Sequence, residues 1–340
     1  MRTALVTGGA GYVGSVLVRL LLEQAWEVLV VDLGLFGWHG LEDVLDHPNL
    51  RVVAADVCHS KASWFDKVDV VFHLAGYSND PMAAADPQRN YQYNAAGTAM
   101  VAQMTREAGV PRFILASSCS VYGYSPHRES TEVDIGRLNF PYAVSKLMAE
   151  EAARCWHDSA VILRFGTIYG YSPRMRFDLA VQAMMKSALK TGEIIVRDAE
   201  RWRPFLHVTD AAYAYEYASR YGRGIYNIPG RNYQIGELAE CVASTIKRYG
   251  LPRPSIVNLS EYDPRNYRVS DERMRKEWSW LPKLTVEEAM WEMLNRAQRD
   301  SSWLDDPRSI NVTWLERRDE LGVRTEEKPS PPGLGPAGAS

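Results

Sequence analysis

The sequence predicts an α/β protein in which a doubly wound parallel sheet is followed by a smaller C-terminal lobe. Over the first two-thirds of the chain, short apolar runs alternate with segments of helical periodicity. The runs lack the apolar and polar alternation of half-exposed strands, which indicates a parallel sheet covered by helices on both faces. A glycine-rich turn over residues 8–14 separates the first run from the first helix, as in the doubly wound (Rossmann) fold.

The expected elements follow the order that such a sheet requires. A helix over residues 13–23 joins the first two strands. The strands of the sheet are expected at residues 4–6, 28–31, 52–53, 68–73, 112–116 and 160–164. After about residue 170 the pattern loosens. There we expect short strands at 193–196 and 224–228 and helices at 177–190, 209–219, 235–249 and 286–299.

This pattern divides the chain into three parts. Residues 1–170 form the expected Rossmann domain, and segments near 200–230 return to it. Residues 171–300 form most of the lobe, which we expect to close over the C-terminal edge of the sheet. Residues 301–340 form a C-terminal extension, and its last ~12 residues, rich in proline and glycine, are expected to be disordered.

Composition and charge argue against several classes of function. The apolar share is 46%, the charged share 24% and the formal net charge −3, so no nucleic-acid partner is expected. No apolar run approaches the ~20 residues of a membrane span, and the N-terminus lacks a signal-peptide pattern, so we expect a cytoplasmic protein without a membrane partner. The four cysteines fit neither a zinc site nor a disulfide framework, and no metal is expected.

The turn over residues 8–14 predicts a phosphate cradle. Gly8, Gly11 and Gly14 stand at three-residue spacing, which suits a tight turn, close approach of the backbone to a pyrophosphate and close packing of helix on strand. Tyr12 and Val13 complete the turn at the start of the helix. The N-terminus of that helix presents unpaired N–H groups and the positive end of its dipole to the phosphates.

A carboxylate at the end of the second strand predicts which dinucleotide is bound. Asp32, followed by Leu33, stands where a carboxylate accepts hydrogen bonds from a ribose diol. The 2′-phosphate of NADP would meet a like charge there. The sequence therefore predicts NAD as the cofactor.

Tyr142 and Lys146 are the candidate catalytic pair. Residues four apart lie on one face of a helix, so the ammonium would lie beside the phenol. A free tyrosine has a pKa of about 10, and a nearby positive charge lowers it. The pair therefore predicts a proton-transfer group close to the cofactor.

Further motifs follow in order along the chain: Asp56-Val57, His73-Leu74-Ala75-Gly76, Asn94 with Gly97-Thr98, Ser117 to Gly123, and Arg203 to Val208. With the glycine turn and the Tyr142–Lys146 pair, they resemble the extended short-chain dehydrogenase/reductases, in the NAD-dependent nucleotide-sugar epimerase and dehydratase group. The pattern is UDP-glucose 4-epimerase-like. The resemblance covers roughly residues 2–298.

The resemblance implies roles for individual residues. Tyr142 would be the acid/base, Lys146 would hold the nicotinamide ribose and lower the pKa of Tyr142, and Ser118 would hydrogen-bond the reacting sugar oxygen. Asp56, Val57, Leu74, Ala75, Gly76 and Asn94 would join the cofactor site. The expected contacts of a nucleotide-diphosphate-sugar substrate are Ser78, Ser118, Ser120, Thr167, Arg174, Arg176, Arg203 and Arg265. A homodimer is expected through the helices that carry Asn94 and Tyr142.

The residues after Ser118 limit which of the family's reactions is expected. The family's 4,6-dehydratases carry an Asp-Glu pair where this chain has Cys119 and Ser120. We therefore expect epimerisation, most plausibly at C4 through a transient 4-keto sugar. The alternatives are a 4-ketoreductase, less readily a 4,6-dehydratase, and remotely a non-catalytic NAD(P)-binding sensor. Cys119 is interpreted as a small packing residue.

Overall fold

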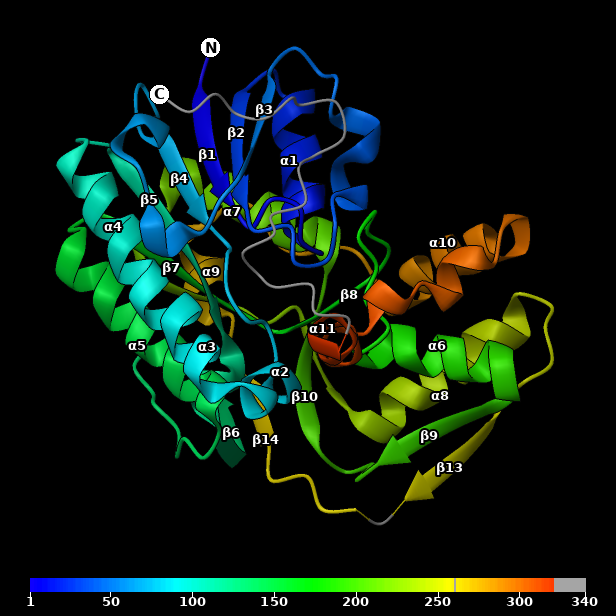
Figure 1. Cartoon of the computed structure of the whole chain (residues 1–340). Coiled ribbons are helices and arrows are strands. Elements are labelled where there is room, and N and C mark those ends of the chain that lie inside the picture. Colours follow the sequence, from blue (N-terminus) through cyan, green and yellow to red (C-terminus); the bar gives the residue numbers. More distant parts are fainter. Residues whose placement is uncertain (260, 321–340) are drawn as a thin grey trace.

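The computed structural model describes residues 1–259 and 261–320, and it confirms the predicted fold class. Within these residues seven parallel strands form one sheet, in the order β11-β7-β5-β4-β1-β2-β3 (Figure 1). The winding reverses between β1 and β4, and a crevice forms at such a reversal at the C-terminal ends of the strands. The strands are β1 (Thr3–Thr7), β2 (Glu27–Asp32), β3 (Leu50–Ala54), β4 (Val70–His73), β5 (Arg112–Ser118), β7 (Ala160–Phe165) and β11 (Gly224–Ile228).

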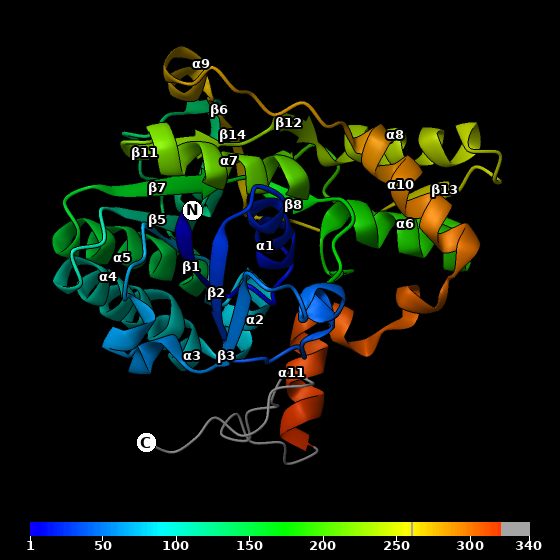
Figure 2. The same ribbon diagram turned by 90° about the horizontal axis from the view of Figure 1, so that it is seen from above.

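Helices cover both faces of this sheet. They include α1 (Gly14–Glu23), α4 (Gly97–Glu107), α5 (Pro141–Trp156) and α7 (Val208–Tyr221). Helices α1 and α7 lie on one face, and α4 and α5 on the other (Figures 1 and 2). Successive strand residues point to opposite faces, so Val6 packs with α1 and α7 while Leu5 packs with α4 and α5.

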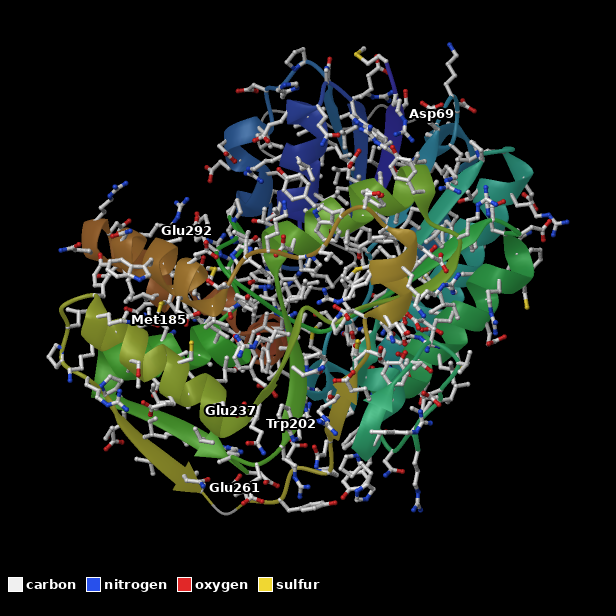
Figure 3. The ribbon with its side chains drawn as sticks, turned by 180° about the vertical axis from the view of Figure 1, so that it is seen from behind. Asp69, Met185, Trp202, Glu237, Glu261 and Glu292 are labelled. Carbon is white, nitrogen blue, oxygen red and sulfur yellow. The ribbon has the colours of Figure 1, made fainter. Side chains whose placement is uncertain are left out.

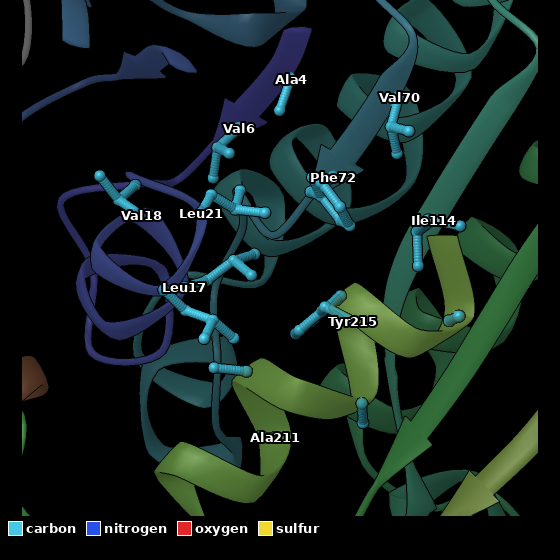
Figure 4. Packing of buried hydrophobic residues seen from close by; sticks show 14 of the residues in the cluster. Ala4, Val6, Leu17, Val18, Leu21, Val70, Phe72, Ile114, Ala211 and Tyr215 are labelled. Carbon is cyan, nitrogen blue, oxygen red and sulfur yellow. The ribbon is translucent and has the colours of Figure 1, made fainter. Parts of the chain in front are cut away.

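Figure 4 shows the core between the sheet and the α1–α7 layer. Leu17 and Leu21 of α1 meet Ala211 and Tyr215 of α7 over the strand residue Phe72. All five are buried, and the rings of Phe72 and Tyr215 pack edge to face with centroids 6.2 Å apart. This layer fixes the start of α1, which forms part of the cavity described below.

The second lobe has its own core. Its main elements are α6 (Ala180–Thr191), β9 (Glu193–Arg197), α8 (Ile235–Arg248), β13 (Ser255–Leu259) and α10 (Val286–Arg299). Met185, labelled in Figure 3, is fully buried with Val242 and Met290 from the neighbouring helices. The lobe lies beside the C-terminal ends of the sheet strands (Figure 1).

Shorter elements connect the two parts. They are α2 (Asp80–Ala85), α3 (Pro87–Tyr91), a π-helical turn (Gln92–Ala96), β6 (Tyr124–Ser130), β8 (Thr167–Tyr169), β10 (Trp202–His207), β12 (Arg231–Gln234), β14 (Asn266–Val269), α9 (Glu272–Glu277) and α11 (Asn311–Glu320), with single 3₁₀ turns between them. Strands β12, β10 and β8 form one small sheet, and β14 pairs with β6.

The expected elements match the observed ones closely, and β11 lies in the main sheet beside β7. The small strands β6, β8, β10 and β12 to β14 were not predicted, because each pairs with residues distant in the sequence. The expected disorder of the last residues concerns a part of the chain outside the described residues. In the part that is described, no helix is long and apolar enough to cross a membrane.

Candidate active site

One cavity of about 730 Å³ lies where the sheet reverses its winding and meets the second lobe. The glycine turn after β1, the loop after β2 and the ends of β4 and β5 form one side. Helix α5, the loop after β8 and segments of the second lobe form the other. Nearly all of the predicted site residues line this one cavity. They are Gly8, Gly11, Tyr12, Val13, Gly14, Asp32, Leu33, Val57, Leu74, Ala75, Gly76, Ser78, Ser118, Ser120, Tyr142, Lys146, Thr167, Arg174, Arg176, Arg203 and Arg265.

The glycine turn leaves no room for side chains at two positions. Gly8 has φ +73°, and a Cβ built on it would lie 2.7 Å from the backbone nitrogen of Ala75. A Cβ on Gly14 would lie 2.2 Å from the carbonyl oxygen of Gly8. Both glycines are therefore required by close backbone packing, which brings α1 and the end of β4 against the turn.

The start of α1 fits a dinucleotide's phosphates. Its N-cap residue Val13 makes no side-chain capping hydrogen bond, and Tyr12 and Val13 both line the cavity. The Tyr12 hydroxyl donates to the carbonyl oxygen of Gly170 at 2.6 Å, which ties the turn to the loop after β8. A helix N-terminus without a side-chain cap is a ready site for an anion.

Asp32 lies at the end of β2 with its carboxylate held in place. Its Oδ2 accepts from the backbone N–H of Ala10 at 3.0 Å, and its Oδ1 accepts from that of Gly34 at 2.8 Å. Burial raises the pKa of Asp32, and these backbone hydrogen bonds lower it in part. The carboxylate lines the cavity beside the glycine turn, a position that suits the predicted contact with a ribose diol.

Tyr142 and Lys146 both lie on α5 and line the cavity. The Lys146 Nζ lies 5.8 Å from the centroid of the Tyr142 ring and donates to the carbonyl oxygen of Ala116 at 3.0 Å. Burial lowers the pKa of Lys146 to about 8, partly offset by Glu150. Burial raises the pKa of Tyr142, and a hydrogen bond with Ser118 and the charge of Arg176 lower it in part. The structure thus adds burial, which the spacing argument did not weigh, to the electrostatics of the pair.

Ser118 and Cys119 stand next to each other at the end of β5 and have different surroundings. Ser118 lines the cavity, helps to lower the pKa of Tyr142, and accepts through its Oγ from the backbone N–H of Ser120 at 3.1 Å. The Cys119 Sγ donates to the carbonyl oxygen of Arg164 at 3.2 Å and packs with Tyr122. Cys119 is therefore a packing residue that does not line the cavity, and burial raises the pKa of its thiol.

Two predicted cofactor residues lie behind the cavity wall. The Asp56 Oδ1 accepts from the backbone N–H of Cys58 at 2.8 Å and caps a short turn. The Asn94 Nδ2 donates to the Ser145 Oγ at 2.9 Å and to the carbonyl oxygen of Tyr77 at 3.1 Å. Asn94 therefore joins α5 to the segment after β4, and the direct cofactor contacts of both residues stay predictions.

Arg203 and Arg265 meet at one carboxylate in the second lobe. The Arg203 Nη2 lies 3.0 Å from the Asp263 Oδ2, and the Arg265 Nε lies 3.0 Å from the Asp263 Oδ1. The Arg265 Nη1 reaches Asp80 at 2.7 Å. All four line the cavity, and Arg203 also stacks on the ring of Tyr267. The group presents guanidinium donors to an anion while balancing its charge internally.

Arg176 lies nearer the catalytic pair. Its Nη2 lies 2.8 Å from the Asp178 Oδ2, and its Nη1 donates to the Ser78 Oγ at 2.9 Å. Asn79 donates to the same Asp178 at 2.8 Å. Burial lowers the pKa of Arg176, but the charge of Asp178 outweighs this and keeps the pKa raised. The nearby Thr167 lines the cavity from β8.

Several residues that line this cavity were not predicted. They are Asp178, Asp263, Asn311 and the loop residues Leu35 and Phe36. The two acidic residues stand two positions from predicted arginines, so pairing of opposite charges was an available signal. Asn311 lies in the C-terminal extension, beyond the region of family resemblance, and no sequence signal indicates it.

Comparison with known proteins agrees with this geometry. Residues 4–236 match the model of the NAD dependent epimerase/dehydratase family. A UDP-glucose 4-epimerase of Erwinia amylovora is 27% identical over 81% of this chain and 96% of its own length. A solved structure of MoeE5 in complex with UDP-glucose and NAD has a TM-score of 0.75 at 25% identity, covering 88% of this chain and 99% of its own.

A dTDP-glucose 4,6-dehydratase of Streptomyces venezuelae, solved with NAD and TYD bound, has the same fold. Its TM-score is 0.79 at 24% identity, and the match covers 89% of this chain and 99% of that protein. The family model spans well over half of the chain. The chain therefore belongs to the NAD dependent epimerase/dehydratase family. It is an enzyme whose cofactor is NAD, and the glycine turn, the uncapped start of α1 and Asp32 are the residues that fit it.

Proposed function

We propose that this protein is a nucleotide-diphosphate-sugar epimerase that acts at C4 through a transient 4-keto sugar. The observation that supports it most directly is the meeting of Tyr142, Lys146 and Ser118 in one cavity. The described carboxylates of that cavity are each held by an arginine or by backbone N–H groups. The similarity to UDP-glucose 4-epimerase points the same way. Arg203 and Arg265 suit the substrate's diphosphate, because guanidinium groups bind phosphate oxygens at two points.

The chain's own residues manage the proton and the sugar. NAD, which the glycine turn and Asp32 would hold, would supply a reversible acceptor for the hydride of the sugar carbon. Tyr142 takes the proton of the 4-hydroxyl as that hydride leaves, and gives it back when the carbonyl is reduced. Ser118 donates a hydrogen bond to the same sugar oxygen. The Lys146 ammonium, 5.8 Å from the centroid of the Tyr142 ring, places a positive charge near the phenolate.

The carboxylates around the cavity argue against a dehydratase. Four of them line it among the described residues: Asp32, Asp80, Asp178 and Asp263. The last three form ion pairs with Arg265 or Arg176, and Asp32 accepts two backbone hydrogen bonds at the end near the glycine turn. Removal of water from a 4-keto sugar needs an acid and a base beside Tyr142. Position 119, where such an acid is expected, holds a buried thiol directed elsewhere.

A homodimer remains part of the proposal. Helices α4 and α5 lie side by side over one face of the sheet (Figure 1), as expected of a surface that pairs with its copy in a four-helix interface. Met148 of α5 is half-exposed there. Light scattering at micromolar concentration tests this, and a mass of one chain would contradict it.

The decisive experiment incubates the purified enzyme with UDP-, dTDP-, GDP-, ADP- and CDP-sugars, without added reduced cofactor. We expect interconversion of one pair of C4 epimers. Anion-exchange chromatography and NMR detect the products. Product that forms only when NADH or NADPH is added would identify a 4-ketoreductase, and loss of water would identify a dehydratase. Tyr142→Phe is the matched control: it should retain NAD and lose at least about 10²-fold in turnover.

A further inference from the structure

Arg174 is a buried cation that forms an ion pair with no carboxylate of the described residues. Its side chain is 1% exposed. Among the described residues no carboxylate lies within ion-pair distance of it, and its Nε is buried without a hydrogen-bond partner there. Burial lowers the pKa of Arg174 to about 9, and the neighbouring charge of Arg176 lowers it further. A buried guanidinium in this state is stabilised by an anion.

The position of Arg174 differs from that of the other cavity arginines. It lies against the loop after β2, with its guanidinium carbon 4.1 Å from the centroid of the Phe36 ring. A Cβ built on Gly40 would lie 2.9 Å from the Arg174 Cβ and 2.7 Å from the carbonyl oxygen of Ala10. Only one glycine therefore separates Arg174 from the phosphate cradle.

Two serines fix the backbone of Arg174 to that cradle. The Ser172 Oγ accepts from the N–H of Arg174 at 3.3 Å and donates to the carbonyl oxygen of Tyr12 at 2.7 Å. The hydroxyls of Ser15 and Ser172 lie 2.9 Å apart. All of these groups are buried, so the loop after β8 and the start of α1 move as one unit.

The C-terminal extension orients the guanidinium. The Asn311 Oδ1, at the start of α11, accepts from the Arg174 Nη2 at 2.6 Å. The Asn311 Nδ2 donates to the Ser78 Oγ at 3.3 Å. Trp314 and Arg318 both donate to the carbonyl oxygen of Leu35, at 2.8 Å and 2.7 Å. In Figure 2, α11 lies on the side of the molecule that carries α2 and β3, away from α8 and α10.

The loop after β2 supplies no polar side chain to this part of the cavity. Residues 33–37 read Leu-Gly-Leu-Phe-Gly, and all of them except Gly34 line the cavity. Polar side-chain contacts here come from Asp32, Arg174 and Asn311. Since Asp32 is an acceptor suited to ribose hydroxyls, Arg174 is a cation available to the neighbouring phosphates.

We propose that Arg174 binds the diphosphate of the NAD cofactor rather than that of the sugar substrate, and that Asn311 of the C-terminal extension holds it in place. The cofactor site then includes residues 301–320. This assignment depends on the family's use of NAD and is independent of which sugar carbon reacts.

The test measures binding to the full-length enzyme after its nucleotide has been removed. Calorimetric titration with NAD, ADP, adenosine and UDP compares the wild type with Arg174→Gln. We expect the Kd for NAD and for ADP to rise about tenfold to a hundredfold, with adenosine and UDP unchanged. Arg296→Gln is the control, because Arg296 also stacks on an aromatic ring, that of Tyr171, at the surface.

A second variant keeps the arginine. Asn311→Asp places a carboxylate on the Arg174 guanidinium and so competes with the phosphates. Its thermal midpoint should stay close to that of the wild type, because the new ion pair with Arg174 offsets the lost Nδ2 donor to Ser78. Its Kd for NAD should rise about tenfold. If Arg174→Gln does not fold, the NAD affinity of Asn311→Asp tests the proposal. NAD affinity equal to wild type in the folded variants would overturn the proposal, and so would weaker binding of UDP with unchanged binding of ADP.

Discussion

Glu150 and Arg164 form a two-point ion pair beneath α5, the helix that carries the proposed catalytic residues Tyr142 and Lys146. The Arg164 Nη2 lies 2.7 Å from the Glu150 Oε2, the Arg164 Nε lies 2.9 Å from the Oε1, and both side chains are at most 2% exposed. Glu150 stands one helical turn after Lys146 on α5, and Arg164 lies on β7. Ser117 also donates to Glu150, at the end of β5. The pair therefore fixes the height and rotation of α5 over the sheet.

Loss of one member of this pair should be costly. Glu150→Gln leaves the Arg164 guanidinium buried without its counter-charge, and the free energy of unfolding should fall by about 3–5 kcal/mol. Urea unfolding followed by circular dichroism measures it. Glu151→Gln, one residue along, removes an exposed pair with Arg154 and should cost less than about 1 kcal/mol. Equal losses in the two variants would contradict this role of the buried pair.

Lys146 predicts a pH-dependent stability. Burial lowers its pKa from 10.5 to about 8, so below pH 8 the folded chain bears the cost of a buried charge. Between pH 8 and 10.5 the folded state loses this proton while the unfolded state keeps it, and the cost fades. The free energy of unfolding of Lys146→Met should therefore exceed that of the wild type by more at pH 7 than at pH 10.5. The difference between the two pH values should be on the order of 3 kcal/mol.

Denaturant titrations at both pH values check this, with exposed Lys247→Met as the control. A difference between Lys146→Met and wild type that stays constant with pH would show that the lysine is not destabilised by burial.

Variants at Arg265 and Arg268 compare an arginine proposed to contact the substrate with one that has only a structural role. Arg265 lines the cavity and contacts Asp80 and Asp263, whereas Arg268 stacks on the Trp202 ring and does not line the cavity. Arg265→Met should raise the KM of the nucleotide sugar about 10-fold to 100-fold without changing NAD affinity. Arg268→Met should change KM by less than about threefold. Steady-state kinetics measures both KM values. A larger rise in KM for Arg268→Met than for Arg265→Met would contradict the proposed substrate contact of Arg265.

Cys119 and Ser120 offer a matched pair at the end of β5. Cys119→Ser should keep kcat within about threefold, because the thiol donates to a backbone carbonyl that a hydroxyl also reaches. The Ser120 Oγ lines the cavity and is buried without a hydrogen-bond partner among the described residues, so Ser120→Ala should raise KM about fivefold or more. Loss of turnover in Cys119→Ser would contradict the packing role and indicate that the thiol takes part in catalysis.

The sheet was predictable because its strands are continuous apolar runs, such as Val28 to Val31. The glycine turn was predictable because such a turn between a buried strand and a helix is typical of a phosphate cradle. The proposed cofactor and catalytic residues come from family motifs, and most of them line the cavity. The small sheets and the ion-pair partners were not predictable to the same degree. Arg265 meets Asp80 across 185 positions of the sequence, and such a contact depends on the whole fold. Arg174 was predicted in the cavity, but its neighbours at the end near Asp32 come from the extension, which no motif covers.

Strand β11 has a consequence for how this chain can be divided. It pairs with β7 only after the chain has passed through much of the second lobe, and α7, which precedes it, covers the adjacent face. A fragment ending near residue 170 would lack both. It would present β7, whose six residues are all buried in the whole protein, as a bare edge strand with unpaired N–H and C=O groups. Such a fragment should aggregate on expression, so the cofactor half of this enzyme is not a separable module.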